Sequence, residues 1–171
     1  GGVMEQPPRN RKERLLNPRV IGKAFFWYGM LASVFSIFSY FFVNLLNGWP
    51  SVPLAGEGSP VYVKATTMTL AAIVFCQVGA VFNCRTERQS VFRVGLFSNR
   101  QVNFGIVFEL FLILALIFLP PLQFVFQTRP IDWSDLLLLC AWPPLILLIE
   151  ETRKALARKM SRKNPLKKTE R

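Results

Sequence analysis

Glu109 is the only ionisable residue in the apolar segment FGIVFELFLILALIF, which runs from Phe104 to Phe118. A charged side chain at the centre of a membrane helix costs roughly 2.5–3.5 kcal/mol on insertion scales, whereas each Leu, Ile, Val or Phe favours insertion by about 0.3–0.6 kcal/mol. The segment therefore inserts despite the acid, and insertion does not explain why it is there. Three interpretations stay open: a protonated structural acid bonded to another helix, a ligand for an ion or proton, or a side chain that reaches the membrane interface.

Gln77 is the second candidate for an ion pathway and lies in the apolar segment ATTMTLAAIVFCQVGAVFNC. A lone glutamine in a membrane helix can equally bond a neighbouring helix, which contributes about 0.6–2 kcal/mol. Other chemistry has little support, because the sequence has no histidine and its three cysteines form no CxxC pair. We predict no catalytic residue and no certain metal site.

Small and polar residues mark the faces on which helices could pack. Gly105 lies one turn before Glu109 and leaves room for a neighbouring helix, which would point Glu109 into a bundle. Ala72, Cys76 and Ala80 form a second small-residue face. The first apolar segment contains small and polar residues at helical spacing, which place them on one face of a helix. We interpret this face chiefly as a packing surface, and its residues are Gly29, Ser33, Ser36, Tyr40 and Asn44.

Four apolar segments must position these residues. A helix needs roughly 20 apolar residues to cross about 30 Å of hydrocarbon, and the candidate spans are residues 24–46, 65–84, 101–124 and 133–149. The sequence thus predicts an all-α, multi-pass membrane bundle of four transmembrane helices, between a basic, Pro-rich segment (1–23) and a basic tail (150–171).

Proline and charged residues suggest how the last two spans are shaped. Pro120–Pro121 should break or kink the third helix near the outer surface. Pro143–Pro144 lies inside the fourth, which should therefore be packed against protein. We expect Asp132 or Ser134 to cap the start of this fourth helix.

Basic residues are segregated from the apolar segments, although the chain is 51% hydrophobic and carries a formal charge of +11. Nineteen of the 21 Lys and Arg residues lie before the first span, between the second and third spans, or after the last one. By the positive-inside rule, both termini and the 85–100 loop are expected to be cytoplasmic. Anionic lipid and topology explain these charges, so we expect a lipid bilayer and no nucleic acid as partner.

Four stretches in order resemble one family: GVMEQPPRNRKERLLN, FNCRTERQSVFRVGLFSN, LPPLQFVFQTRPIDWSDLL and PLILLIEETRKALARK. They are similar to the C-terminal transmembrane region of type II P-type cation ATPases, which include calcium pumps and sodium/potassium pumps. The resemblance covers essentially the whole chain. It implies that the four spans are helices seven to ten of a ten-helix transport domain.

The resemblance also implies residue roles. Gln77 falls where calcium pumps place an acid or amide of helix eight that can bind the ion, and Glu109 where sodium/potassium-type pumps place a ninth-helix glutamate. Ala80 stands where those pumps carry an aspartate, which is unfavourable for a complete sodium site. The sequence contains no DKTGT motif, so the resemblance implies that ATP and Mg²⁺ bind other domains, that no cofactor binds this chain, and that a transported cation is possible.

The expected function is the C-terminal membrane domain of a cation-transporting P-type ATPase, which supports and partly lines the ion pathway without being catalytic alone. Its partners would be the remaining helices and the cytoplasmic domains of the parent pump. Two alternatives stay open. One is a self-contained four-helix ion transporter or channel, and the other is a non-transporting membrane scaffold or regulatory subunit.

Overall fold

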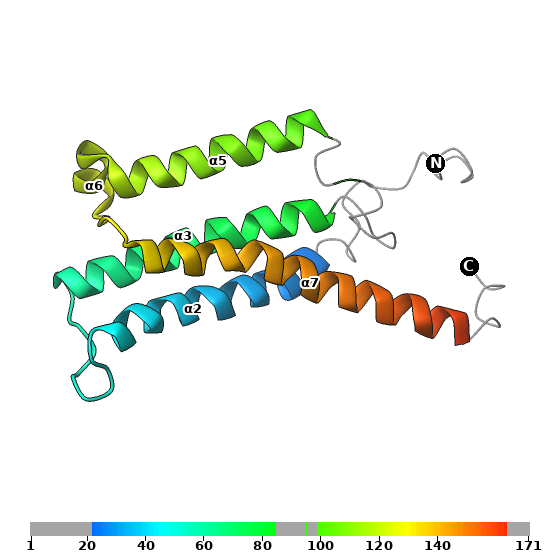
Figure 1. Ribbon diagram of the computed structural model, residues 1–171, viewed down its shortest axis with the longest axis horizontal. Helices are drawn as coiled ribbons and strands as arrows, with labels where there is room; N and C mark the ends of the chain where they lie inside the picture. Colours follow the sequence, from blue (N-terminus) through cyan, green and yellow to red (C-terminus); the bar gives the residue numbers. More distant parts are fainter. Residues whose placement is uncertain (1–21, 85–94, 96–98, 164–171) are drawn as a thin grey trace. The chain divides into compact units, whose positions relative to one another are not determined.

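The computed structural model describes residues 22–84, 95 and 99–163 (Figure 1). The predicted N-terminal segment, most of the 85–100 loop and the end of the tail lie outside these residues. The chain divides into two units between Met30 and Leu31. The packing described below is that of the second unit.

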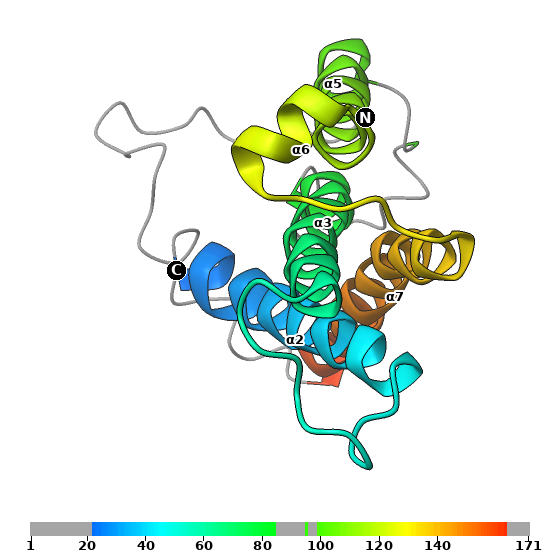
Figure 2. The same cartoon turned by 90° about the vertical axis from the view of Figure 1, so that its left-hand side faces the viewer.

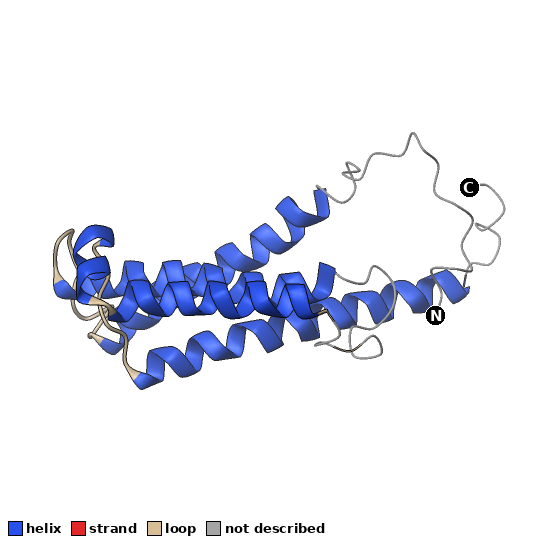
Figure 3. Cartoon of the chain, turned by 90° about the horizontal axis from the view of Figure 1, so that it is seen from above, coloured by secondary structure: helices blue, strands red, loops and turns tan. Residues whose placement is uncertain are grey.

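All regular structure in the described part of the chain is helical (Figure 3). The elements are a π-helix, Lys23–Tyr28, followed by α2 (Gly29–Leu46), α3 (Pro60–Cys84), α5 (Arg100–Phe118), α6 (Pro120–Phe126) and α7 (Trp133–Lys163). Four spans are long and apolar enough to cross a membrane: Phe25–Leu46, Pro60–Cys84, Arg100–Phe118 and Trp133–Lys159. The predicted all-α membrane bundle of four transmembrane helices is therefore confirmed.

The helix ends differ from the expected ones where proline intervenes. α5 ends at Phe118 rather than at residue 124, because Leu119 is extended and Pro120 begins the separate helix α6. The break expected at Pro120–Pro121 is thus present. α3 begins at Pro60, five residues before the expected start, and α7 continues beyond residue 149 to Lys163.

α3 lies at the centre of the bundle, between α5 on one side and α2 and α7 on the other (Figure 2). It runs parallel to α7, so that the start of each helix lies at the same end of the bundle (Figure 1). Its buried positions recur every three or four residues, which forms a continuous helical face: Ala65, Met68, Ala72, Cys76, Gly79 and Asn83. The corresponding apolar positions of α7 are Leu139, Trp142 and Ile146.

Gly79 is the point of closest approach between α3 and α7. A Cβ atom at this position would lie 2.9 Å from the carbonyl oxygen of Pro143 and 3.1 Å from Cβ of Ile146. The Pro143–Pro144 segment, which lies inside α7, is therefore packed against another helix, as the sequence predicts. Gly79 rather than Ala80 continues the buried face of Ala72 and Cys76, because seven residues complete almost two helical turns. Ala80 is half-buried beside it.

Candidate functional site

Glu109 lies half-buried on α5, beside the buried positions Ile106 and Ile113. Its carboxylate makes no hydrogen bond or ion pair with another residue in the described part of the chain. Gly105 is exposed, and an added Cβ would meet nothing within 4 Å. Hence no described helix of this chain fills the space beside Gly105 or bonds the acid.

Gln77 lies on an exposed stripe of α3, together with Leu70, Ile73 and Val81. This stripe faces away from Gly79, since two residues along a helix turn the side chain by about 200°. Among the described residues, none accepts or donates a hydrogen bond to the Gln77 amide, and no hydrogen bond joins it to Glu109. Neither candidate ion-pathway residue is thus bonded by another side chain in the described part of the chain.

The polar stripe of α2 is only partly buried. Ser36 and Asn44 are buried, Tyr40 is half-buried and Ser33 is exposed. Ser36 Oγ donates to the Ser33 carbonyl at 3.0 Å, and Asn44 Nδ2 donates to the Tyr40 carbonyl at 3.0 Å. The side-chain donors of these two buried residues are therefore satisfied by carbonyl groups of their own helix. The residues can then lie in a packed surface without bonding a partner helix.

Ser39 makes the polar contact between α2 and α7, and the sequence reasoning missed it. The indole Nε1 of Trp142 donates to Ser39 Oγ at 3.1 Å, and Ser39 in turn donates to the Phe35 carbonyl at 2.8 Å. Trp142 also stacks on Phe35, with ring centroids 4.6 Å apart. The available signal was the spacing of Phe35, Ser39 and Val43, four residues apart on one face.

Replacing Trp142 by phenylalanine removes the indole donor while an aromatic ring remains against Phe35. We expect Trp142→Phe and Ser39→Ala each to lower the free energy of unfolding by about 0.5–2 kcal/mol, the range of interhelical hydrogen bonds in membrane proteins. A double-mutant cycle in mixed detergent micelles separates this bond from the lost ring volume. Strictly additive effects of the two substitutions would exclude a bond of any energetic weight.

Lys64, near the start of α3, binds two carboxylates at the start of α7. Its Nζ lies 2.8 Å from Asp135 and 2.5 Å from Asp132. The two acids differ greatly in environment, because the Asp132 side chain is 77% exposed and that of Asp135 is 0% exposed. Asp135 Oδ2 also accepts the backbone N–H of Asp132 at 2.9 Å.

Asp135 therefore contributes the side-chain bond at the start of α7, where Asp132 or Ser134 was expected to do so. Asp132 occupies the position before the first helical residue, and the acid three residues later bonds back to its N–H, which is one half of a capping box. The ion pairs to Lys64 were not predicted, because Lys64 and the two acids lie about 70 residues apart in the sequence and nothing local connects them.

No group of three or more His, Cys, Asp or Glu residues that could hold a metal ion occurs in the described segments. The chemistry available within the described part of the chain is thus limited to single amide and carboxylate oxygens in membrane helices. Such oxygens contribute to a cation site only together with further ligands, because Ca²⁺ takes six to eight oxygens.

Four membrane-spanning helices define the chain as an integral membrane protein. The family described as "Cation transporting ATPase, C-terminus" matches residues 1–156. The chain belongs to this family, which confirms its resemblance to the C-terminal transmembrane region of type II P-type ATPases.

The names of similar proteins agree with this assignment. "Calcium-transporting ATPase type 2C member 2" of Mus musculus is 28% identical over 163 residues, which is 95% of this chain and 16% of the relative. The Rattus norvegicus protein of the same name is 31% identical over 152 residues, or 89% of this chain and 15% of the relative. "Calcium-transporting ATPase 1" of Saccharomyces cerevisiae is 28% identical over 157 residues, or 92% and 15%. The chain spans about one-sixth of the length of these relatives.

Proposed function

We propose that this chain is the C-terminal membrane part of a calcium-transporting pump, in which it supports and partly lines the ion pathway. The observation that carries the proposal is the family match over residues 1–156, together with relatives named as calcium-transporting ATPases. Phosphorylation and the binding of ATP and Mg²⁺ belong, on this proposal, to the cytoplasmic domains of the parent pump. The remaining helices of that pump are the proposed partners of the bundle.

Gln77 and Glu109 are the residues that we propose to face those helices. A polar side chain in hydrocarbon is costly unless protein or water satisfies it. Gln77 is exposed on α3 and Glu109 half-buried on α5, and neither is bonded within the described segments. Their amide and carboxylate oxygens are ligands that Ca²⁺ favours. A helix of the parent pump beside Gly105 would complete the surroundings of Glu109.

Calcium is a better candidate cargo than sodium or potassium for this chain. Ala80 has no oxygen on its side chain, and it stands where the resemblance to sodium/potassium-type pumps implies an aspartate. Gln77 retains a side-chain oxygen where the resemblance to calcium pumps implies a ligand. This difference supports calcium, in agreement with the names of the relatives.

Both termini and the 85–100 loop are cytoplasmic in this proposal. The basis is the distribution of 19 of the 21 Lys and Arg residues on one side of the four spans. The connection from α2 to α3 and the segment from α6 to α7 then lie at the outer end of the bundle.

Gln77→Ala tests the role in calcium binding. We expect it to raise the calcium concentration for half-maximal ATP hydrolysis by the full-length protein at least about tenfold, because a polar group bonded to a charged one contributes about 1.5–3 kcal/mol. Ile73→Ala is the matched control, since it lies one turn earlier on the same exposed stripe. Equal calcium dependence in the two variants would remove Gln77 from the ion pathway.

Glu109→Gln tests the second candidate and separates charge from shape, because the amide has nearly the same size as the carboxyl group. If Glu109 contributes a charge to the ion or proton pathway, calcium affinity or its dependence on pH changes in ATPase assays of the full-length protein. Phe108→Leu is a control at the neighbouring exposed position. Unchanged calcium and pH profiles in Glu109→Gln would reduce Glu109 to a structural acid.

A further inference from the structure

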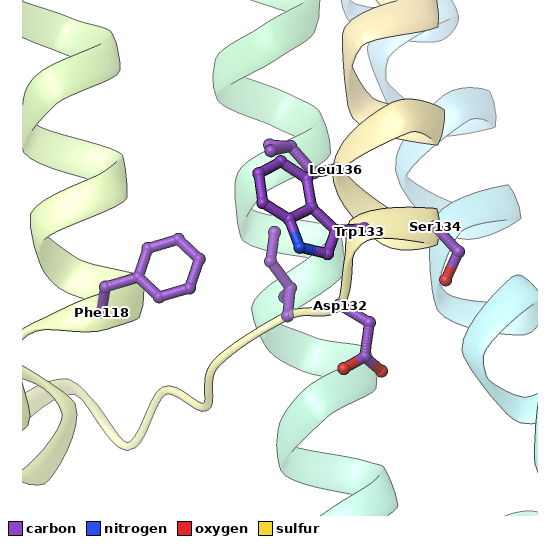
Figure 4. Close-up of a pocket in the computed structure, with 6 residues that line it drawn as sticks. Phe118, Asp132, Trp133, Ser134 and Leu136 are labelled. Atoms are coloured by element: carbon purple, nitrogen blue, oxygen red, sulfur yellow. The ribbon is translucent and has the colours of Figure 1, made fainter.

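A cavity of about 560 Å³ opens where α5 ends and α7 begins. We call it the Trp133 cavity, and its lining residues are Phe118, Ile131, Asp132, Trp133, Ser134 and Leu136. Figure 4 shows the Phe118 ring pointing from α5 toward Trp133, with Leu136 above the indole and the Asp132 carboxylate below it. The cavity therefore has apolar and aromatic walls and an acid at its edge.

The depth of this cavity in the bilayer follows from its residues. Phe118 is the last residue of one membrane span and Trp133 is the first residue of another. Tryptophan at the end of a span lies at the level of the lipid headgroups. The Trp133 side chain is 82% exposed, so its indole face is available to a lipid and is not used in packing the described helices.

The charges around the cavity are arranged as a dipole. Asp132 is largely exposed, and only its Oδ2 is bonded to Lys64, whose ammonium group also neutralises Asp135. A second cavity of about 320 Å³, the Arg129 cavity, shares Asp132 and is also lined by Lys64 and Arg129. Arg129 is exposed and makes no ion pair with any acid in the described segments. The Asp132 carboxylate thus borders the Trp133 cavity, and the Arg129 guanidinium borders the neighbouring Arg129 cavity.

We infer that the two cavities together bind one phospholipid with a choline headgroup. The quaternary ammonium group would lie against the indole of Trp133, because aromatic faces attract quaternary ammonium ligands, and near the Asp132 oxygen that Lys64 does not bind. The phosphate would lie toward Arg129, and an acyl chain would run along Phe118 and Leu136. A zwitterionic headgroup matches the arrangement of one acid and one free guanidinium, whereas an anionic headgroup would meet Asp132.

Native mass spectrometry of the full-length protein tests this inference. The protein is reconstituted with equal amounts of phosphatidylcholine, phosphatidylethanolamine and phosphatidylglycerol, and the lipid retained after extraction is identified. We expect preferential retention of one phosphatidylcholine. Equal retention of the three lipids, or preference for phosphatidylglycerol, would overturn the assignment.

Trp133→Leu keeps an apolar wall but removes the aromatic face. We expect it to lower the retention of phosphatidylcholine roughly three- to tenfold, and Arg129→Gln to lower it as well. Phe124→Leu is the matched control, because this aromatic residue on α6 is 88% exposed and lines neither cavity. An unchanged melting temperature shows that each variant is folded. Equal losses in Trp133→Leu and Phe124→Leu, or none in Trp133→Leu, would contradict a specific site.

Discussion

Replacing Lys64 by methionine is expected to lower the free energy of unfolding of the bundle by about 3–5 kcal/mol. Lys64 lies 2.8 Å from Asp135, whose side chain is 0% exposed. Removal of one partner of a buried ion pair leaves the other charge without compensation in a medium that solvates it poorly. The measurement is unfolding of the full-length protein in mixed micelles that contain an increasing fraction of denaturing detergent, followed by circular dichroism.

Asp132→Asn is the matched control for this prediction, because Lys64 also contacts Asp132 but that side chain is 77% exposed. An exposed ion pair contributes only about 0–1 kcal/mol, so this variant should unfold close to the wild type. The double variant Lys64→Met, Asp135→Leu removes both buried charges and should recover much of the loss. If Lys64→Met is no more harmful than Asp132→Asn, the buried pair does not hold α3 to α7.

Gly79→Leu is expected to prevent the close packing of α3 on α7. Even the single methyl group of Gly79→Ala would lie 2.9 Å from the Pro143 carbonyl oxygen and 3.1 Å from Pro143 Cα. These are backbone atoms that no rotamer change can move, so the helices must separate. We expect a loss of about 1–3 kcal/mol for Gly79→Ala and a larger loss for Gly79→Leu.

The opposing effect on Gly79 is helix propensity, since alanine favours a helix over glycine by about 1 kcal/mol. Gly105→Ala isolates this term, because an added Cβ there meets nothing within 4 Å. It should therefore be neutral or slightly stabilising with respect to the described helices. Melting temperatures of the full-length variants give the comparison, and a Gly79→Ala protein as stable as Gly105→Ala would show that the helices are not in tight contact.

The membrane spans were predictable because their signal is local. A run of about 20 apolar residues identifies each span without knowledge of its neighbours. Pro120–Pro121 likewise breaks the chain between α5 and α6 through its own ring geometry. The end of α5 was placed too late, since apolar residues continue through the short helix α6 and hydropathy does not distinguish a span from an apolar turn.

The candidate site was only partly accessible from the sequence. Glu109 and Gln77 stand out because polar residues are rare in apolar segments. Whether a described helix faces them was not predictable, because the lipid-facing and the helix-facing positions of a membrane span are both largely apolar. Ser39 shows the same problem, since one serine among several gained its role from Trp142, which lies 103 residues away.

By itself, the sequence determined that this chain forms four membrane helices and belongs among the C-terminal regions of cation-transporting ATPases, since length, hydropathy and ordered motifs are properties of the linear chain. Only the tertiary structure decided which residues meet. Lys64 forms an ion pair with Asp135, and Gly79 packs closely against the backbone of Pro143. These pairings depend on how α3 and α7 lie in parallel, and helix direction and rotation are set by packing in three dimensions.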